Sequence, residues 1–444
     1  MKQHHLSITL IVLLAGIAGT CSNDVSHDWP QYLGPNRNST SSETGILRTW
    51  PENGPEVLWT ADVGIGFGGP VIKDNRVYLL DRNDTVGDIM RCFDFSSGEE
   101  LWRFGYDAPG SFMFPGSRSV PTVDGNFIYS CSQNGDLYCI DISTHNPVWH
   151  KNVWTDFGGD RLPIWGITQC PLIYGDLLII ASQTPETGVV AFNKLTGNVA
   201  WKTPNLGPET YVSPAVVKID GEDHIVMVTS STNPIGHPEL EFSPGNVVGI
   251  DPGTGEILWK YSNWLCHITV ANAVDAGNNK ILIVGGYELG AVMIKVEKQP
   301  DGSYGTKEIL RTEEFGDQTK PPLLINGYFY AQYGTNSRRD GLVCMRMDGK
   351  IMWKTGRNPD FNKGSMIYVD GLILATDGAK SLYLIEPDTS GFKPLASADL
   401  LAAKPGDERM ARMFATQNWG PIALSGGRLL IRDQSRLMCV KVAK

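Results

Sequence analysis

Four ten-residue stretches of this sequence decide the fold: FDFSSGEELW (Phe93–Trp102), IDISTHNPVW (Ile140–Trp149), FNKLTGNVAW (Phe192–Trp201) and IDPGTGEILW (Ile250–Trp259). Each has an apolar start, a turn and a terminal tryptophan. Trp59 and Trp353 extend the series, and successive tryptophans are separated by 43, 47, 52, 58 and 94 residues, the last gap spanning two units. A period in the forties is typical of β-propellers, in which each repeat forms one four-stranded sheet.

Eight units can be counted from paired apolar runs around Asp-Gly or similar turns. They begin near Gly69, Val120, Cys170, Pro214, Ala273, Pro321, Ser365 and Pro421. The eighth unit ends after its third strand, whereas Pro55–Val63 carries Trp59 without preceding strands of its own. We therefore expect an all-β, eight-bladed propeller whose ring is closed by this N-terminal strand, which removes the exposed sheet edges.

The motif residues have structural roles in this interpretation. Gly98, Gly197, Gly255 and Gly349 lie four residues before a tryptophan, where a tight turn needs a positive φ. Asp94, Asp141, Asn193 and Asp251 lie eight residues before it, in position to accept hydrogen bonds from the turn backbone. The indoles are expected to dock neighbouring blades, with each N–H reaching a carbonyl. This docking set is Trp59, Trp102, Trp149, Trp201, Trp259 and Trp353.

The repeat resembles the tryptophan-docking motif of PQQ-like eight-bladed propellers, with AFNKLTGNVAW (191–201) and GIDPGTGEILW (249–259) as the best copies. The segment DWPQYLGPNRNSTSSETGILRTW (28–50) further resembles the leader of secreted bacterial PQQ-like proteins without an assigned activity. That superfamily includes quinoprotein alcohol dehydrogenases and the propeller lipoprotein of the outer-membrane assembly machinery. The resemblance covers about Trp29 to Val442, and units five and seven depart from it because they lack the tryptophan.

The chain ends and net charge predict location and partners. Residues 1–21 are read as an export signal, 22–54 as a leader packed on the propeller, and 55–444 as the propeller. Cys21 follows IAGT and resembles the lipidated cysteine of bacterial lipoproteins, although Thr20 replaces the usual small residue. We expect a monomer in the periplasm or at the outer membrane, touching membrane only through this lipid. A net charge of −10 argues against nucleic-acid binding.

Eight cysteines in an exported chain suggest disulfides, but the repeat register argues otherwise. Cys92, Cys139, Cys344 and Cys439 share one third-strand position, held elsewhere by Ala191, Gly249, Met293 and Leu384, and are expected to be buried thiols. A two-residue turn at Asn134-Gly135 would place Cys131 and Cys139 on opposite faces of the sheet. The pairing of Cys170 and Cys266 is open.

Motifs for catalysis are scarce. The quinoprotein dehydrogenases use a vicinal cysteine disulfide over the quinone, and a carboxylate with an asparagine to hold Ca²⁺ beside a catalytic aspartate. This sequence has no Cys-Cys pair, no haem motif and no zincin or hydrolase motif. We therefore assign no catalytic residue, no metal and no confident cofactor, and PQQ lacks the support of a vicinal cysteine pair. His145 and His237 are read as loop residues.

Segments that precede the first strand of each blade gather around the mouth of a propeller's central channel. Here they contain cationic, aromatic and amide side chains that would form a funnel suited to an anionic or sugar ligand. The candidates are Arg118, Arg161, Trp165, Gln169, Tyr211, His267, Asn272, Lys320, Asn362, Lys363, Arg412 and Trp419.

Two classes of function follow. The first is an exported binding or scaffold propeller without PQQ, whose partner is another exported protein or an anionic or glycan ligand. The second is an enzyme, either a quinone-dependent oxidoreductase or a carbohydrate-active enzyme on acidic glycans. The latter would need an acid/base pair, for example His267 with Tyr211 or Asp317.

Overall fold

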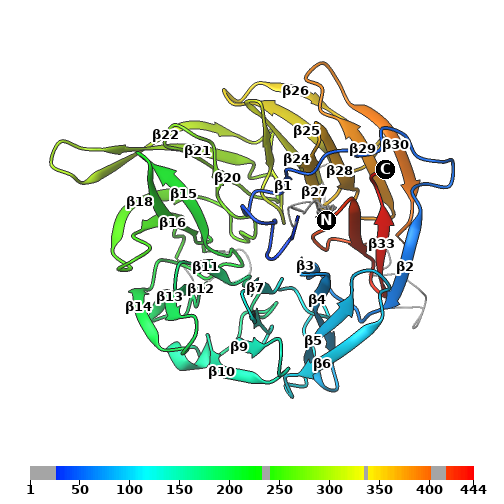
Figure 1. Cartoon of the computed structure of the whole chain (residues 1–444). Helices are drawn as coiled ribbons and strands as arrows, with labels where there is room; N and C mark the ends of the chain where they lie inside the picture. The colour runs from blue at the N-terminus through cyan, green and yellow to red at the C-terminus, as the bar shows by residue number, and fades with distance from the viewer. Residues whose placement is uncertain (1–26, 233–240, 335–338, 402–416) are drawn as a thin grey trace, which may run out of the picture.

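The computed structural model describes residues 27–232, 241–334, 339–401 and 417–444. Within these ranges the strands form eight sheets, seven of four strands and one of five, arranged as blades around a central axis (Figure 1). One short 3-10 helix, Thr155–Phe157, accompanies them in the described ranges. The expected all-β, eight-bladed propeller is confirmed.

In each of the first seven blades, four consecutive strands are ordered from the axis outward. Blade 1 consists of β3 (Val71–Lys73), β4 (Arg76–Asn83), β5 (Gly87–Asp94) and β6 (Glu100–Gly105). Blade 2 consists of β7 (Thr122–Asp124), β8 (Phe127–Cys131), β9 (Asp136–Asp141) and β10 (Pro147–Asn152). Blade 3 consists of β11 (Leu172–Tyr174), β12 (Leu177–Ala181), β13 (Thr187–Asn193) and β14 (Val199–Pro204). Blade 4 consists of β15 (Ala215–Ile219), β16 (Glu222–Val228), β17 (Gly245–Ile250) and β18 (Ile257–Trp264).

The second half of the ring repeats this plan. Blade 5 consists of β19 (Val274–Asp275), β20 (Lys280–Val284), β21 (Ala291–Lys298) and β22 (Tyr304–Thr312). Blade 6 consists of β23 (Leu323–Ile325), β24 (Tyr328–Gly334), β25 (Arg339–Arg346) and β26 (Ile351–Lys354). Blade 7 consists of β27 (Met366–Val369), β28 (Leu372–Thr376), β29 (Ser381–Glu386) and β30 (Lys393–Asp399), with β1 (Thr40–Ser41) added in parallel to β27.

Blade 8 closes the ring. Its strands β31 (Ala423–Ser425), β32 (Arg428–Arg432) and β33 (Arg436–Lys441) come from the C-terminal segment, and its outer strand is β2 (Val57–Asp62). β2 pairs antiparallel with β33, so that Trp59 lies opposite Cys439 (Figure 1). Residues near the two ends of the chain therefore share one sheet, as the missing fourth strand of the last repeat predicted.

Five of the six expected docking tryptophans contact the motif turn of the next blade. The sixth, Trp259, donates instead to His224 Nδ1 in its own blade at 2.9 Å, so the expectation that every indole N–H reaches a carbonyl is wrong there. Trp59 Nε1 donates to Phe95 O at 2.9 Å, and the same contact recurs from Trp149 to Lys194 O at 3.0 Å, from Trp201 to Pro252 O at 3.1 Å and from Trp353 to Asp388 O at 2.8 Å. The motif glycine lies against the indole, because a Cβ on Gly255 would approach Trp201 Cε3 to 2.6 Å. In the turn of blade 2, His145 takes the glycine position with φ 60° and stacks on Trp102.

The cysteine column lies directly opposite these tryptophans in the strand register. Cys92, Cys139, Cys344 and Cys439 pair with Trp102, Trp149, Trp353 and Trp59. Where the tryptophan is missing, the column holds a residue larger than cysteine opposite a residue smaller than tryptophan: Met293 faces Leu310 in blade 5, and Leu384 faces Ala396 in blade 7. A larger residue in the column therefore compensates for the smaller residue that faces it, as a close-packed interior requires.

The seven described cysteines are free and buried, including Cys170 and Cys266. The expected two-residue turn after Cys131 is wrong, because Cys131 pairs with Leu137 rather than Tyr138. Ser132 N–H donates to Asp136 O, which leaves a three-residue loop of Gln133, Asn134 and Gly135 between them. Cys131 and Cys139 consequently lie on the same face of the sheet, in one hydrophobic cluster. Cys21 lies outside the described residues.

The leader lies across the inner strands at one end of the channel. Trp29 exchanges two backbone hydrogen bonds with Ile72 of blade 1, and Pro30 O accepts from Val123 N in blade 2. Further along, Ser39 O accepts from Tyr368 N in blade 7, and the Glu43 carboxylate accepts from Gly427 N in blade 8 at 2.6 Å. These contacts hold the leader against the hub. Within the described ranges, no helix has the length and apolar character needed to cross a bilayer.

Candidate functional site

A cavity of about 460 Å³ lies where the segments before the inner strands converge on the axis. All eight of these segments contribute to its wall, as expected for the mouth of a propeller channel. Tyr32 of the leader and Tyr287 of the β20–β21 connection complete it. The residues from the eight segments include Phe67, Phe114, Arg118, Trp165, Thr168, Tyr211, Ser213, Asn272, Gln318, Thr319, Lys320, Asn362, Lys363, Gln417 and Trp419.

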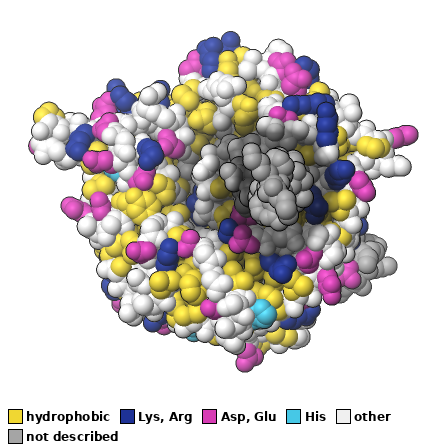
Figure 2. Space-filling model, viewed as in Figure 1, with side chains coloured by type: hydrophobic (Ala, Val, Ile, Leu, Met, Phe, Trp, Pro, Cys, Tyr) yellow, Lys and Arg dark blue, Asp and Glu magenta, His cyan; other side chains and the backbone are white. Residues whose placement is uncertain are grey.

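The charged side chains in the described wall are all cationic: Arg118, Lys320 and Lys363. Lys320 Nζ donates to Trp419 O at 2.8 Å, and Lys363 Nζ lies 4.6 Å from the centre of the Trp419 ring. Burial lowers the pKa of Lys320 to about 8 and that of Arg118 to about 10, so both stay cationic at neutral pH. On the face shown in Figure 2, by contrast, Lys and Arg are interspersed with Asp and Glu.

The cations occupy opposite walls. Arg118 precedes blade 2 and Lys320 precedes blade 6, which are four blades apart in an eight-bladed ring. Lys363 precedes blade 7, beside Lys320. A ligand across the cavity would therefore meet positive charge at both ends.

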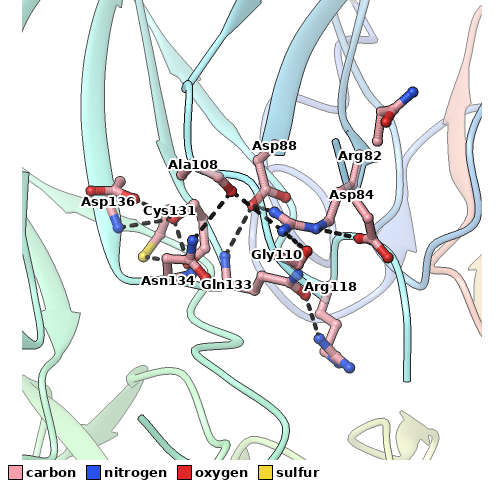
Figure 3. A network of polar contacts seen from close by, with 12 residues as sticks. Arg82, Asp84, Asp88, Ala108, Gly110, Arg118, Cys131, Gln133, Asn134 and Asp136 are labelled. Atoms are coloured by element: carbon pink, nitrogen blue, oxygen red, sulfur yellow. Dashed lines mark hydrogen bonds and ion pairs between the residues drawn. The ribbon is translucent and has the colours of Figure 1, made fainter. Parts of the chain in front are cut away.

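Arg118 is held by a buried network behind the wall (Figure 3). Its Nη1 donates to Gln133 Oε1 at 2.7 Å, and Gln133 N donates to the Asp88 carboxylate at 3.3 Å. Asp88 pairs with Arg82 at 2.8 Å, and both side chains are fully buried. Arg82 also donates to Gly110 O, which anchors the loop that carries Phe114. The network thus fixes a cation and an aromatic side chain of the cavity together.

Asp317 lies beneath Lys320 and is 1 % exposed. Its carboxylate accepts from Thr319 N at 2.9 Å, Lys320 N at 3.0 Å and Gln332 N at 3.2 Å. Burial raises the pKa of Asp317 to about 6 despite these bonds. Asp317 therefore positions the Lys320 segment rather than facing the cavity.

The wall has an aromatic half and a polar half. Aromatic rings come from the segments before blades 8 and 1 to 4: Trp419, Phe67, Phe114, Trp165 and Tyr211. Neighbouring centroids are 5.4 Å apart for Phe67 and Trp419, 6.1 Å for Phe114 and Trp165, and 5.0 Å for Trp165 and Tyr211. The segments before blades 5 to 7 supply amides, a hydroxyl and both ammonium groups instead. Such a wall suits an anion with one flat or apolar face.

Eight of the twelve candidates from the sequence line this cavity: Arg118, Trp165, Tyr211, Asn272, Lys320, Asn362, Lys363 and Trp419. Three others lie elsewhere. Gln169 is buried and donates to Val212 O at 2.9 Å, while Arg161 and His267 line a second depression. Other residues of the same segments, Trp165, Thr168 and Asn272, do line the cavity, so the direction of the individual side chain decides. Arg412 lies outside the described residues.

The sequence interpretation missed several wall residues. Phe67 and Phe114 precede the inner strands of blades 1 and 2, so the positional rule could have found them. Tyr32 and Tyr287 come from the leader and from a strand connection, and that rule does not cover them.

The acid/base pair considered for an enzyme is not assembled. Tyr211 faces the central cavity, His267 faces the second depression, and Asp317 is buried. In the described part of the chain, no three His, Cys, Asp or Glu side chains cluster as metal ligands.

Comparison with known proteins identifies the repeat. A family model described as outer membrane protein assembly factor BamB (PQQ_2) matches residues 86–355. This chain belongs to that family.

Curated relatives share its repeats over part of their length. The BamB of Salmonella typhimurium is 26 % identical over 111 residues, which cover 22 % of this chain and 26 % of the relative. The BamB of Shewanella oneidensis is 23 % identical, covering 47 % and 62 %, and a quinoprotein ethanol dehydrogenase of Pseudomonas aeruginosa is 27 % identical, covering 40 % and 26 %. The matched stretches span less than two thirds of each relative.

Solved structures share the fold. The crystal structure of BamB from Moraxella catarrhalis superposes with a TM-score of 0.56 at 11 % identity, covering 87 % of this chain and 99 % of the other. A europium-containing methanol dehydrogenase superposes with a TM-score of 0.60 at 13 % identity, covering 91 % and 89 %. Family and fold thus agree.

Proposed function

We propose that this chain is an exported binding propeller whose central cavity holds an anionic ligand. One observation carries the proposal: three cations and no carboxylate line the described wall, in a chain of net charge −10. Because the cations are partly desolvated, an anion that enters gains more attraction than it would at the surface. The aromatic half favours a ligand with a sugar or ring face. The name of the BamB relatives, outer membrane protein assembly factor, supports a place at the outer membrane. A periplasmic location and lipidation at Cys21 are part of the same proposal and rest on the N-terminal sequence pattern.

PQQ fits this cavity only in part. Its carboxylates match the cations, but the described wall offers no carboxylate to hold the Ca²⁺ that accompanies the quinone in the dehydrogenases. Among the side chains of the described wall, amide oxygens would come from Asn272, Gln318, Asn362 and Gln417. The residues therefore do not fit the calcium–quinone pair, and we derive no catalytic step from it.

A second function, docking of another exported protein, is favoured by apolar side chains at the mouth of the cavity. Met113 and Ile164, adjacent in sequence to the wall residues Phe114 and Trp165, are 63 % and 60 % exposed. Exposed apolar groups beside a pocket are typical of interaction sites. Loss of a co-purifying protein from Met113→Ser/Ile164→Ser, but not from Leu195→Ser, would support docking.

The anion site is tested by calorimetric titration with digalacturonate, citrate and the neutral disaccharide maltose. We expect the two anions to bind and maltose not to bind. Lys320→Met and Lys363→Met should each weaken anion binding about tenfold or more, because each removes one charge from the wall. Lys295→Met changes a half-buried lysine of β21 that pairs with Glu297 and does not line the cavity, and it serves as the control.

Equal binding of maltose, or unchanged anion affinity in both lysine variants, would refute the anion site. Addition of PQQ with Ca²⁺ that gives a bound quinone spectrum would instead favour the oxidoreductase.

A further inference from the structure

A second depression, of about 790 Å³, lies over blades 3 and 4. It is formed by the connections after β10, β12, β14, β16 and β18. Among its lining residues are Arg161, Gln183, Asn205, Glu209 and His267. No part of the function proposed above uses this depression.

Buried polar atoms at the floor of the depression have no partner in the described part of the chain. Both amide atoms of Gln183 and the indole Nε1 of Trp154 are without a hydrogen bond, although these residues are 5 % and 4 % exposed. Gln183 also has a φ of 55°, which a non-glycine residue adopts at a cost. Unpaired buried polar groups are rare and need an explanation, because each costs about 1–3 kcal/mol. A bound polar ligand would supply the missing hydrogen-bond partners.

The depression and the central cavity are neighbours. A small cavity of about 10 Å³ lies between them and shares Thr168 with the central cavity. It shares Trp154, Gln183 and Glu209 with the depression. The two sites are therefore separated by about one layer of side chains.

Their charges differ. All charged side chains in the described wall of the central cavity are cationic. The depression, by contrast, is lined by two acidic side chains, Asp160 and Glu209, and one basic side chain, Arg161. Burial lowers the pKa of His267, so this side chain is neutral at pH 7. The central cavity selects an anion, and the depression selects an uncharged group with donors and acceptors.

We propose that the depression is a subsite for hydroxyl-bearing sugar units of an acidic oligosaccharide whose charged unit occupies the central cavity. This inference rests on the proposed function. Side-chain amides and carboxylates pair well with sugar hydroxyls, which both donate and accept. A peptide is the poorer match, because extended peptides need apolar pockets for alternate side chains, and the aliphatic groups here are Pro185 and Pro208.

The test is a calorimetric length series of glucuronate alone, glucuronate linked to one glucose unit and glucuronate linked to three glucose units, with cellotetraose as the neutral probe. The wild type should bind the tetrasaccharide at least tenfold more tightly than glucuronate. Gln183→Asn keeps a residue that tolerates a positive φ but shortens the amide, and Glu209→Gln removes only charge. Both should lose about tenfold for the tetrasaccharide and leave glucuronate binding unchanged. Gln299→Ala, in the exposed β21–β22 turn, should change neither.

The outcomes separate the two proposals. The subsite is overturned if the wild type binds all three lengths with equal affinity, or if Gln183→Asn weakens the binding of glucuronate and of the tetrasaccharide equally. The anion site still stands in that case, provided that Lys320→Met weakens the binding of every uronate. Binding of cellotetraose that depends on Gln183, with no uronate binding, supports the depression and refutes the central anion site. No binding of any saccharide overturns the subsite.

Discussion

Replacing Gly255 by alanine should reveal how much the docking contact contributes to stability. Gly255 has a φ of 78°, and an added Cβ would lie 2.6 Å from Trp201 Cε3 and 2.7 Å from Trp201 Cδ2. Gly221, in the same blade, has a φ of 86° but no atom within 4 Å of such a Cβ. The two glycines therefore share the backbone penalty and differ in the clash.

The magnitude follows from these two terms. A non-glycine residue in the left-handed region costs about 1–2 kcal/mol, and overpacking a buried contact costs about 1–3 kcal/mol more. Gly255→Ala should therefore lower the free energy of unfolding by about 2–5 kcal/mol, and Gly221→Ala by about 1–2 kcal/mol. In a Trp201→Ala background the clash is absent, so Gly255→Ala should cost only the backbone term.

The assay is urea unfolding followed by far-UV circular dichroism on the four single and double variants and the wild type. If Gly255→Ala destabilises no more than Gly221→Ala, or if its cost is unchanged in Trp201→Ala, the indole does not rest on the motif turn as described.

Three further predictions use the same physics. Trp59→Ala should lower the free energy of unfolding in urea by about 3–5 kcal/mol, because it removes a buried indole, 8 % exposed, and its hydrogen bond to Phe95 O at the ring closure. A loss below about 1 kcal/mol would contradict that role. Anion binding should weaken as pH rises from 7 to 9 with a midpoint near 8, because Lys320 is cationic below its pKa of about 8 and neutral above it. Lys320→Arg should abolish this midpoint, and a midpoint that persists in the variant would assign the titration to another group. Asp88→Asn should lower the free energy of unfolding by about 3 kcal/mol at pH 7, because Arg82 loses a buried counter-charge. The double variant Arg82→Met/Asp88→Leu should lose less stability in the same assay, and the reverse order would be inconsistent with a buried ion pair.

The ring could be predicted because its rules are local and repeated. Asp251 predicts the turn it caps, and its carboxylate accepts from Gly253 N and Thr254 N. The loop after Cys131 could not be predicted, since a two-residue and a three-residue turn can both contain the Asn134-Gly135 pair, and the register depends on the partner strand.

The place of a residue in the segment before an inner strand predicted most of the cavity wall, but the direction in which each side chain points came only from the structure. Trp165 and Arg161 lie in the same segment, yet only Trp165 faces the axis. Tyr32 reaches the wall because the leader folds back across the hub, which no periodicity of the repeats encodes.

By itself, the sequence determined the number of blades, five of the six docking tryptophans and the closure of the ring, because each rests on a short repeated pattern whose backbone geometry is set by neighbours in the chain. Only the tertiary structure decided which side chains share the cavity, which cations face each other across it, and that a second depression lies beside it. Those relations join residues hundreds of positions apart, and they depend on how each loop turns at the axis rather than on the identity of its residues.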